Sequence, residues 1–93
     1  MVGETYSGDG VYITFTESGV TVKWTTQDNS VTTKKATYGG TTIYKYREGV
    51  LWNVSGSTNY FILLPCIGIS NCIYFKYFNE LGSMYWEVTC TKN

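Results

Sequence analysis

Apolar and polar residues alternate with a period of two from residue 11 onward, and clusters of Gly, Asn, Asp and Ser interrupt this alternation repeatedly. The pattern is typical of half-buried β-strands joined by tight turns. The 3.6-residue apolar period of an amphipathic helix is missing, so the sequence predicts an all-β fold. We expect about eight short strands. They are assigned to residues 11–16, 20–26, 31–38, 41–46, 50–55, 60–65, 72–78 and 84–91.

The segments between these strands are short and rich in turn formers, such as Gly39-Gly40 and Arg47-Glu48-Gly49. Connections of this length join antiparallel neighbours and are too short for the crossovers that parallel strands need. A run of consecutive hairpins is a meander, which removes its exposed edges by closing on itself or by folding into two layers. We predict a small up-and-down β-barrel, with a two-sheet β-sandwich as the alternative.

The chain is short enough to form a single domain over residues 1–93, because its 93 residues can support only one modest core. Apolar residues make up 43% and aromatic residues 17%, which supplies enough buriable surface to argue against disorder. The regular alternation begins only at Val11. Residues 1–9 are therefore expected to form a loosely ordered N-terminal segment.

Charge is sparse and balanced, with seven basic and seven acidic residues. Such a chain has no long-range field to attract nucleic acid or an anionic membrane surface, and its apolar runs are far too short to span a bilayer. We therefore expect neither partner. The low charge and abundant hydroxyl groups favour a secreted or extracytoplasmic protein whose signal has been removed, with a cytoplasmic location as the alternative.

The sequence offers little catalytic chemistry. It has no histidine, the commonest general base, and most carboxylates stand at predicted turns. Within a predicted strand only Glu87 supplies a carboxylate, so the paired carboxylates of a glycosidase are missing. The cysteines lack the paired short spacing of zinc sites. We predict a protein that is not an enzyme and that uses no metal or cofactor.

Three cysteines, Cys66, Cys72 and Cys90, allow at most one intramolecular disulfide. A five-residue loop places Cys66 opposite Cys72, and a three-residue loop at Glu80-Leu81-Gly82 places Cys72 opposite Cys90. Cys72 can therefore pair with either neighbour, whereas Cys66 and Cys90 are two strands apart. We favour the Cys72–Cys90 pair.

Two-residue turns at Asp28-Asn29 and Gly39-Gly40 set a register that points polar and aromatic side chains of two central strands inward. Lys35, Tyr44 and Tyr46 of these strands are expected to converge with Trp24 and Trp52 of the adjacent strands. Because a closed cluster would leave an ammonium group unsatisfied, we predict a binding site in the barrel interior or mouth for a saccharide-like or anionic small molecule. The competing interpretation is that the rings are core and that Lys35 extends into solvent.

The last hairpin carries aromatic side chains on both faces, and the core cannot cover both of them. Tyr74, Phe78, Tyr85 and Trp86 are the predicted contact residues. An apolar face left uncovered often marks a contact with another protein chain. The alternative function is therefore a protein-interaction domain, such as a secreted effector, an inhibitor or an immunity-type protein, and a homodimer is the simplest contact of this kind.

Overall fold

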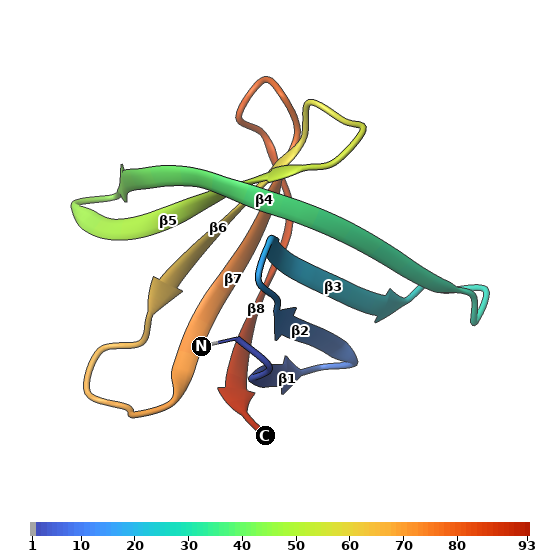
Figure 1. Ribbon diagram of the computed structural model, residues 1–93, viewed down its shortest axis with the longest axis horizontal. Coiled ribbons are helices and arrows are strands. Elements are labelled where there is room, and N and C mark those ends of the chain that lie inside the picture. The colour runs from blue at the N-terminus through green and yellow to red at the C-terminus, as the bar shows by residue number, and fades with distance from the viewer. Residues whose placement is uncertain (1) are drawn as a thin grey trace.

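The chain folds as a closed barrel of antiparallel strands (Figure 1). The computed structural model describes residues 2–93. Its strands are β1 (Thr5–Gly8), β2 (Val11–Phe15), β3 (Gly19–Thr25), β4 (Val31–Tyr44), β5 (Arg47–Val54), β6 (Tyr60–Pro65), β7 (Cys72–Phe78) and β8 (Met84–Lys92). Each strand pairs with the next, and β8 pairs with β1 through Ser7 opposite Thr91. The predicted all-β meander and its closure into a small barrel are confirmed.

The N-terminal segment is more ordered than predicted, because residues 5–8 form strand β1. Asp9 and Gly10 make the turn to β2, and both take positive φ angles, 47° and 80°. Such a turn matches the twist of the two strands it joins. β1 is the strand that closes the barrel against β8, whereas Met1 lies outside the described residues.

The predicted turn at Gly39-Gly40 is instead a β-bulge inside the long strand β4. Gly40 has a φ of 102°, and β4 continues through it to a two-residue turn at Lys45 and Tyr46, whose φ angles are 48° and 69°. Arg47-Glu48-Gly49, predicted as a loop, begins β5. Residues 2–93 thus form eight strands, as expected. Two of the predicted strands are a single strand, β4, and β1 was not predicted.

The barrel interior is a packed apolar core. Ile13, Val22, Phe61 and Phe75 are completely buried. The rings of Phe61 and Phe75 lie 4.8 Å apart at their centroids. Because these side chains fill the barrel along its axis, a ligand site must be sought at the ends or on the outer surface.

A second bulge, between Tyr77 and Phe78 in the pairing of β7 with β8, determines which residues lie opposite the cysteines. The loop at residues 80–82 has the predicted length, since Asn79 N–H donates to Ser83 O at 2.9 Å. Beyond it the bulge shifts the register by one residue. Cys72 consequently lies opposite Thr91, and Cys90 turns to the other face of the sheet.

The predicted Cys72–Cys90 disulfide is therefore wrong, and Cys66 is bonded to Cys72. Their predicted positions opposite one another are confirmed, because Cys66 N–H donates to Cys72 O at 3.0 Å. This disulfide closes the loop between β6 and β7. Cys90 is a free, buried thiol.

We expect Cys90 to be inert to iodoacetamide in the native protein at pH 7. Burial, assisted by the negative charge of Asp9, raises the pKa of its thiol to about 11. Only the thiolate is nucleophilic, and a pKa of about 11 leaves roughly one thiolate in ten thousand at pH 7. Mass spectrometry should find no label on the native chain and one label after unfolding in urea without reductant. Rapid labelling of the native chain would contradict the buried position of Cys90.

Candidate functional site

The predicted interior cluster does not form, because the strand that carries Lys35 turns this side chain away from the interior. Lys35 lies opposite Thr21 and is exposed on the outer surface. The turn between β3 and β4 has three residues rather than two, since Thr26 N–H donates to Ser30 O at 2.8 Å and Asn29 takes a φ of 65°. One additional turn residue reverses the face of every β4 side chain relative to the prediction.

Trp24 and Trp52 point into the barrel, as predicted, but they belong to different parts of it. Trp24 packs against Trp86, with ring centroids 5.1 Å apart. Trp52 contacts Phe15 and Tyr38 edge to face, at 6.1 and 5.7 Å. The Trp52 indole N–H is buried and has no acceptor among residues 2–93. The two indoles therefore do not build one site.

The two predicted tyrosines lie outside the barrel interior. Tyr44 lies on the outer side of β4, where its ring centroid is 5.7 Å from that of Phe78. Tyr46 is fully exposed in the turn between β4 and β5. The five predicted ligand residues are therefore distributed over several separate parts of the molecule.

The predicted partner-binding residues are also divided. Trp86 faces the core and contacts Phe75 with ring centroids 5.3 Å apart. Tyr85 is about half exposed, beside the bulge in β8, and packs on Tyr77 at 4.8 Å. Tyr74 and Phe78 remain on the outer side of β7. The last hairpin thus presents one exposed ring, Tyr85, rather than a continuous aromatic face.

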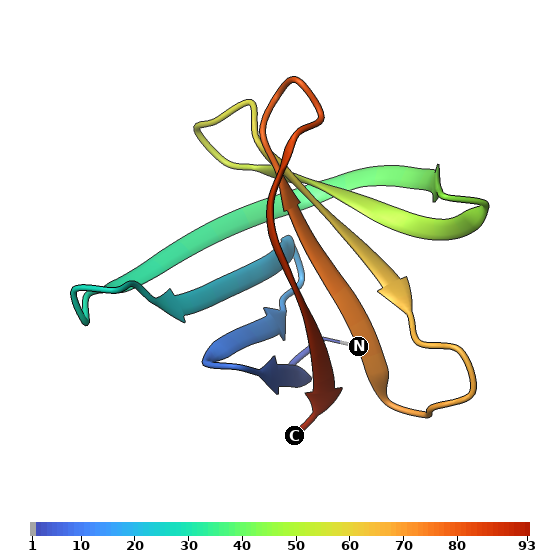
Figure 2. The same ribbon diagram turned by 180° about the vertical axis from the view of Figure 1, so that it is seen from behind.

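A second apolar cluster forms outside the barrel, on β6 and β7. Ile62, Leu64 and Phe78 are buried there beneath Tyr44, Tyr60 and Tyr74. Gly49 permits this packing, because a Cβ at that position would lie 2.5 Å from Leu64 Cδ2. The hairpin of β4 and β5 can therefore come close to the outer side of β6, and it projects beyond the rest of the barrel (Figure 2).

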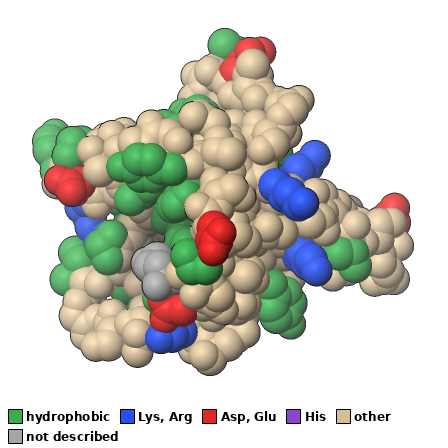
Figure 3. Space-filling view, viewed as in Figure 1, with side chains coloured by type: hydrophobic (Ala, Val, Ile, Leu, Met, Phe, Trp, Pro, Cys, Tyr) green, Lys and Arg blue, Asp and Glu red, His purple; other side chains and the backbone are tan. Residues whose placement is uncertain are grey.

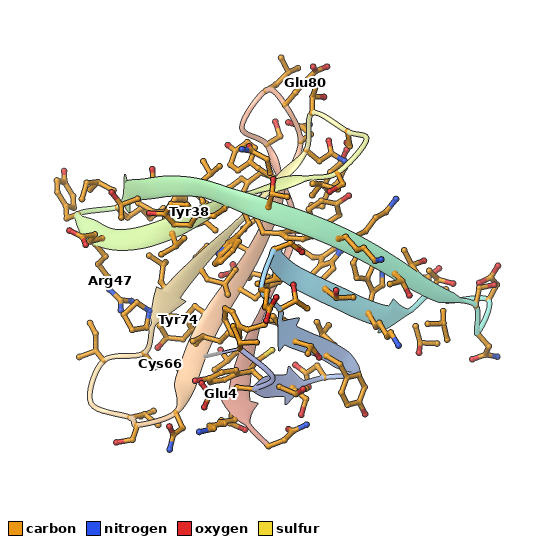
Figure 4. All side chains as sticks on the ribbon, in the orientation of Figure 1. Glu4, Tyr38, Arg47, Cys66, Tyr74 and Glu80 are labelled. Atoms are coloured by element: carbon orange, nitrogen blue, oxygen red, sulfur yellow. A yellow bond between two sulfur atoms is a disulfide. The ribbon has the colours of Figure 1, made fainter. Side chains whose placement is uncertain are left out.

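Leu64, Tyr44 and Tyr74 of this cluster also line a groove that we call the outer groove. Its volume is about 290 Å³. The residues that line it are Tyr44, Lys45, Arg47, Leu64, Tyr74, Lys76, Glu87 and Thr89. Figure 4 shows Arg47 extending from β5 toward the end of β6, near which Tyr74 also lies. The tip of the β4–β5 hairpin and the outer face of β6, β7 and β8 therefore share one concave surface.

Cationic groups lie close to the two rings of the outer groove. The Arg47 guanidinium is 5.5 Å from the Tyr74 ring centroid. Lys45 Nζ and Lys76 Nζ are 5.5 and 5.2 Å from the Tyr44 ring centroid. At these distances the ring quadrupole attracts the cation. The groove thus combines apolar ring surface with positive charge.

Part of this charge is already compensated. Lys76 Nζ lies 2.6 Å from Glu87 Oε1, the one carboxylate that lines the outer groove. Arg47 donates from Nη2 to Pro65 O, which fixes the guanidinium beside Tyr74. A guanidinium has five N–H donors, so most of the Arg47 donors stay available to an acceptor. Arg47 and exposed Lys45 are therefore the cations best placed to bind an anion.

The described residues offer no metal site. Within residues 2–93, no group of three His, Cys, Asp or Glu side chains could hold a metal ion. In the same part of the chain no helix is suited to crossing a membrane. Among the residues that line the outer groove, Glu87 supplies the only carboxylate, and this carboxylate is bound to Lys76.

Tyr44 and Tyr74 were among the predicted site residues, whereas Lys45, Arg47 and Lys76 were not. The sequence pattern predicts Lys45 within a strand and Arg47 in a loop, whereas in the structure the turn is at Lys45 and Tyr46. One signal was present in the sequence. Gly49 follows two charged residues and precedes an apolar run, and a glycine within a strand often marks a close approach of other groups.

Comparisons with known proteins give no relative from which a function could be transferred. No protein-family model matches the chain, and searches of curated proteins and of solved structures found no significant match. The function is therefore inferred from the geometry of the described residues alone.

Proposed function

We propose that the chain is a non-enzymatic binding domain that holds a small anionic molecule in the outer groove. One observation carries the proposal: three cationic side chains and two tyrosine rings converge on one concave surface with a single carboxylate. An arginine guanidinium such as that of Arg47 can form charge-assisted, often bidentate hydrogen bonds with a carboxylate or phosphate. A binding role is supported over catalysis by paired carboxylates, because the one carboxylate of the groove is bound to Lys76.

The size and the rings of the outer groove narrow the ligand class. Its volume of about 290 Å³ suits a ligand of about one sugar ring. Tyr44 and Tyr74 offer apolar ring surface to such a ligand, while Arg47 and Lys45 receive its acidic group. We therefore propose an acidic saccharide, such as a uronic acid or a sialic acid, as the ligand class.

We expect glucuronate to bind to the outer groove and glucose, which lacks the carboxylate, to bind at least tenfold more weakly. A charge-assisted hydrogen bond contributes about 1.5–3 kcal/mol, which corresponds to roughly a 10- to 150-fold change in Kd. Arg47→Gln should cause a loss of this size, and affinity should fall as sodium chloride is raised from 20 to 300 mM. Chemical shifts of the Arg47, Tyr44 and Tyr74 resonances, followed by NMR during titration, provide the measurement.

Two controls separate binding from folding effects. Lys45→Gln changes an exposed cation of the groove, whereas Lys23→Gln changes an exposed cation on β3 outside it. Lys45→Gln should weaken glucuronate binding, and Lys23→Gln should leave it unchanged. The proposal fails if glucuronate, N-acetylneuraminate and sulfate all leave these resonances unshifted at 50 mM, or if glucose binds as tightly as glucuronate.

A protein-interaction role through the last hairpin receives less support. The prediction relied on four rings, and two of them, Phe78 and Trp86, are packed against other side chains. Leu81, Met84 and Tyr85 remain exposed near the tip of the hairpin. A different surface, on strand β4, favours a protein partner more strongly.

A further inference from the structure

Strand β4 has a free edge along its second half. β3 accompanies β4 only as far as Thr37, which lies opposite Gly19. From Tyr38 to Tyr44, β4 pairs with β5 on one side, and no other strand among residues 2–93 pairs with its second side. Alternate residues of such a stretch turn their N–H and C=O groups away from the sheet. These groups can pair with an additional strand.

The free edge lacks most of the features that prevent strand addition. It contains no charged residue and no proline between Tyr38 and Tyr44. Natural edges are commonly guarded by lysine, by proline or by a covering loop. The bulge at Gly39 and Gly40 interrupts the edge, but these two residues have no side chains that would keep another backbone at a distance.

An apolar pocket lies beside this edge at the open end of the barrel, and we call it the apolar mouth. It has a volume of about 240 Å³ and is lined by Phe15, Tyr38, Val50, Trp52, Leu63, Leu64, Pro65 and Ile73. None of these side chains is charged. On the face shown in Figure 3, hydrophobic side chains gather around a hollow below the β4–β5 hairpin. The mouth is therefore suited to apolar side chains.

A narrower slot of about 190 Å³ continues from the apolar mouth to the turn between β2 and β3. Phe15, Tyr38 and Trp52 line both spaces. Glu17 is the one charged side chain that lines the slot. A segment lying along the edge of β4 would thus meet apolar groups over most of its length and a carboxylate at one end.

We propose that an extended segment of a partner protein adds to the free edge of β4 as a further strand. Its main chain pairs with Tyr38 to Tyr44, its alternate apolar side chains enter the apolar mouth, and a basic residue at one end meets Glu17. Main-chain hydrogen bonds supply affinity in this recognition mode, and pockets for alternate side chains supply specificity. This site is distinct from the outer groove, although Tyr44 and Leu64 border both.

A single segment suits this position better than a second copy of the chain. The added strand continues the line of β3, which ends at Gly19 beside Thr37. If β4 of a second copy occupied that line, its tight turn at Lys45 and Tyr46 would run into the turn between β2 and β3. A peptide segment with free chain on both sides can bend away at that point.

Selection from a displayed library of random ten-residue peptides on the intact immobilised chain tests the proposal. Enriched peptides should carry apolar residues at alternate positions and a basic residue at one end. Ile43→Lys should weaken their binding at least tenfold, because it places a charge on the free edge. Val31→Lys is the matched control, since Val31 and Ile43 are both 67% exposed and both belong to β4, but Val31 pairs with β3.

Synthetic versions of the enriched peptides then distinguish strand addition from simple burial of side chains. The amides of the bound peptide form two alternating sets, of which only one faces β4. N-methylation of that set should weaken binding at least tenfold, and N-methylation of the other set should leave binding unchanged. Peptide binding is measured without glucuronate, and glucuronate binding without peptide, so a failure here is distinct from a failure of anion binding.

Three results would overturn the proposal. The first is equal enrichment of library peptides on the wild-type chain and on Ile43→Lys. The second is a set of binders that tolerate N-methylation at every position. The third is a concentration-dependent dimer, seen by sedimentation velocity and abolished by Ile43→Lys, since it would identify a second copy as the occupant of the edge.

Discussion

Gly8→Ala should lower the free energy of unfolding by about 3 kcal/mol or more, at the upper end of the usual cost of overpacking. A Cβ at Gly8 would overlap the carbonyl oxygen of Thr89 and lie 3.3 Å from the Cα of Cys90. Both atoms belong to the backbone of β8, which cannot rotate aside as a flexible side chain can. The added methyl group must therefore separate β1 from β8, where the barrel closes.

Urea unfolding followed by tryptophan fluorescence measures this effect. Thr91→Ala is the control, because Thr91 is an exposed residue of β8 near the same closure and its truncation should cost less than about 0.5 kcal/mol. Hydrogen exchange should also become faster at the amides of β1 and β8 in Gly8→Ala. An unchanged unfolding midpoint in Gly8→Ala would show that β1 and β8 do not approach as described.

The class of the fold could be predicted from the sequence because the alternation of apolar residues is a local signal. Ile13, Phe15, Val20 and Val22 are apolar residues at alternate positions of the first two predicted strands, and all four are buried. The position of Cys66 opposite Cys72 also followed correctly from the length of one loop. Features that depend on short-range spacing were therefore predictable.

Features that depend on the strand register accumulated over several turns could not be predicted from the sequence. The turn between β3 and β4 differs from the predicted one by a single residue, and this moved Lys35 from the interior to the outer surface. The bulge in β8 likewise turned Cys90 away from Cys72. Because side chains alternate between the two faces, each one-residue error reverses every later assignment on that strand. Bulges leave no strong mark in a single sequence.

The candidate site was missed for a different reason. The predicted site consisted of polar and aromatic groups inside the barrel, where a buried charge needs a partner. The outer groove instead uses the solvent side of the sheet, where lysine and arginine are ordinary residues. Its distinguishing feature is that Arg47, brought in by the β4–β5 hairpin, lies beside Tyr74 of β7. That contact joins strands two places apart in the barrel and cannot be read from local pattern.

Phe75→Ala is expected to destabilise the protein by about 3–5 kcal/mol, the range measured for truncation of a buried phenylalanine. Phe75 is completely buried and contacts Phe61 and Trp86, whose ring centroids lie 4.8 and 5.3 Å from its own. Its removal leaves a cavity that these large rings can fill only in part. Because a domain of this size has a total stability of about 5–14 kcal/mol, the loss would be a large fraction of the total.

Tyr12→Ala is the matched control for Phe75→Ala, because Tyr12 is a strand aromatic that is 51% exposed. Its truncation should cost less than about 1 kcal/mol. If Phe75→Ala does not fold, Phe75→Leu keeps most of the volume and should cost less than about 2 kcal/mol in the same urea titration. Equal losses for Phe75→Ala and Tyr12→Ala would mean that the barrel interior is not the main source of stability. The outer cluster beneath Tyr44 and Tyr74 would then have to be a second core, and substitutions in the outer groove would change folding as well as binding.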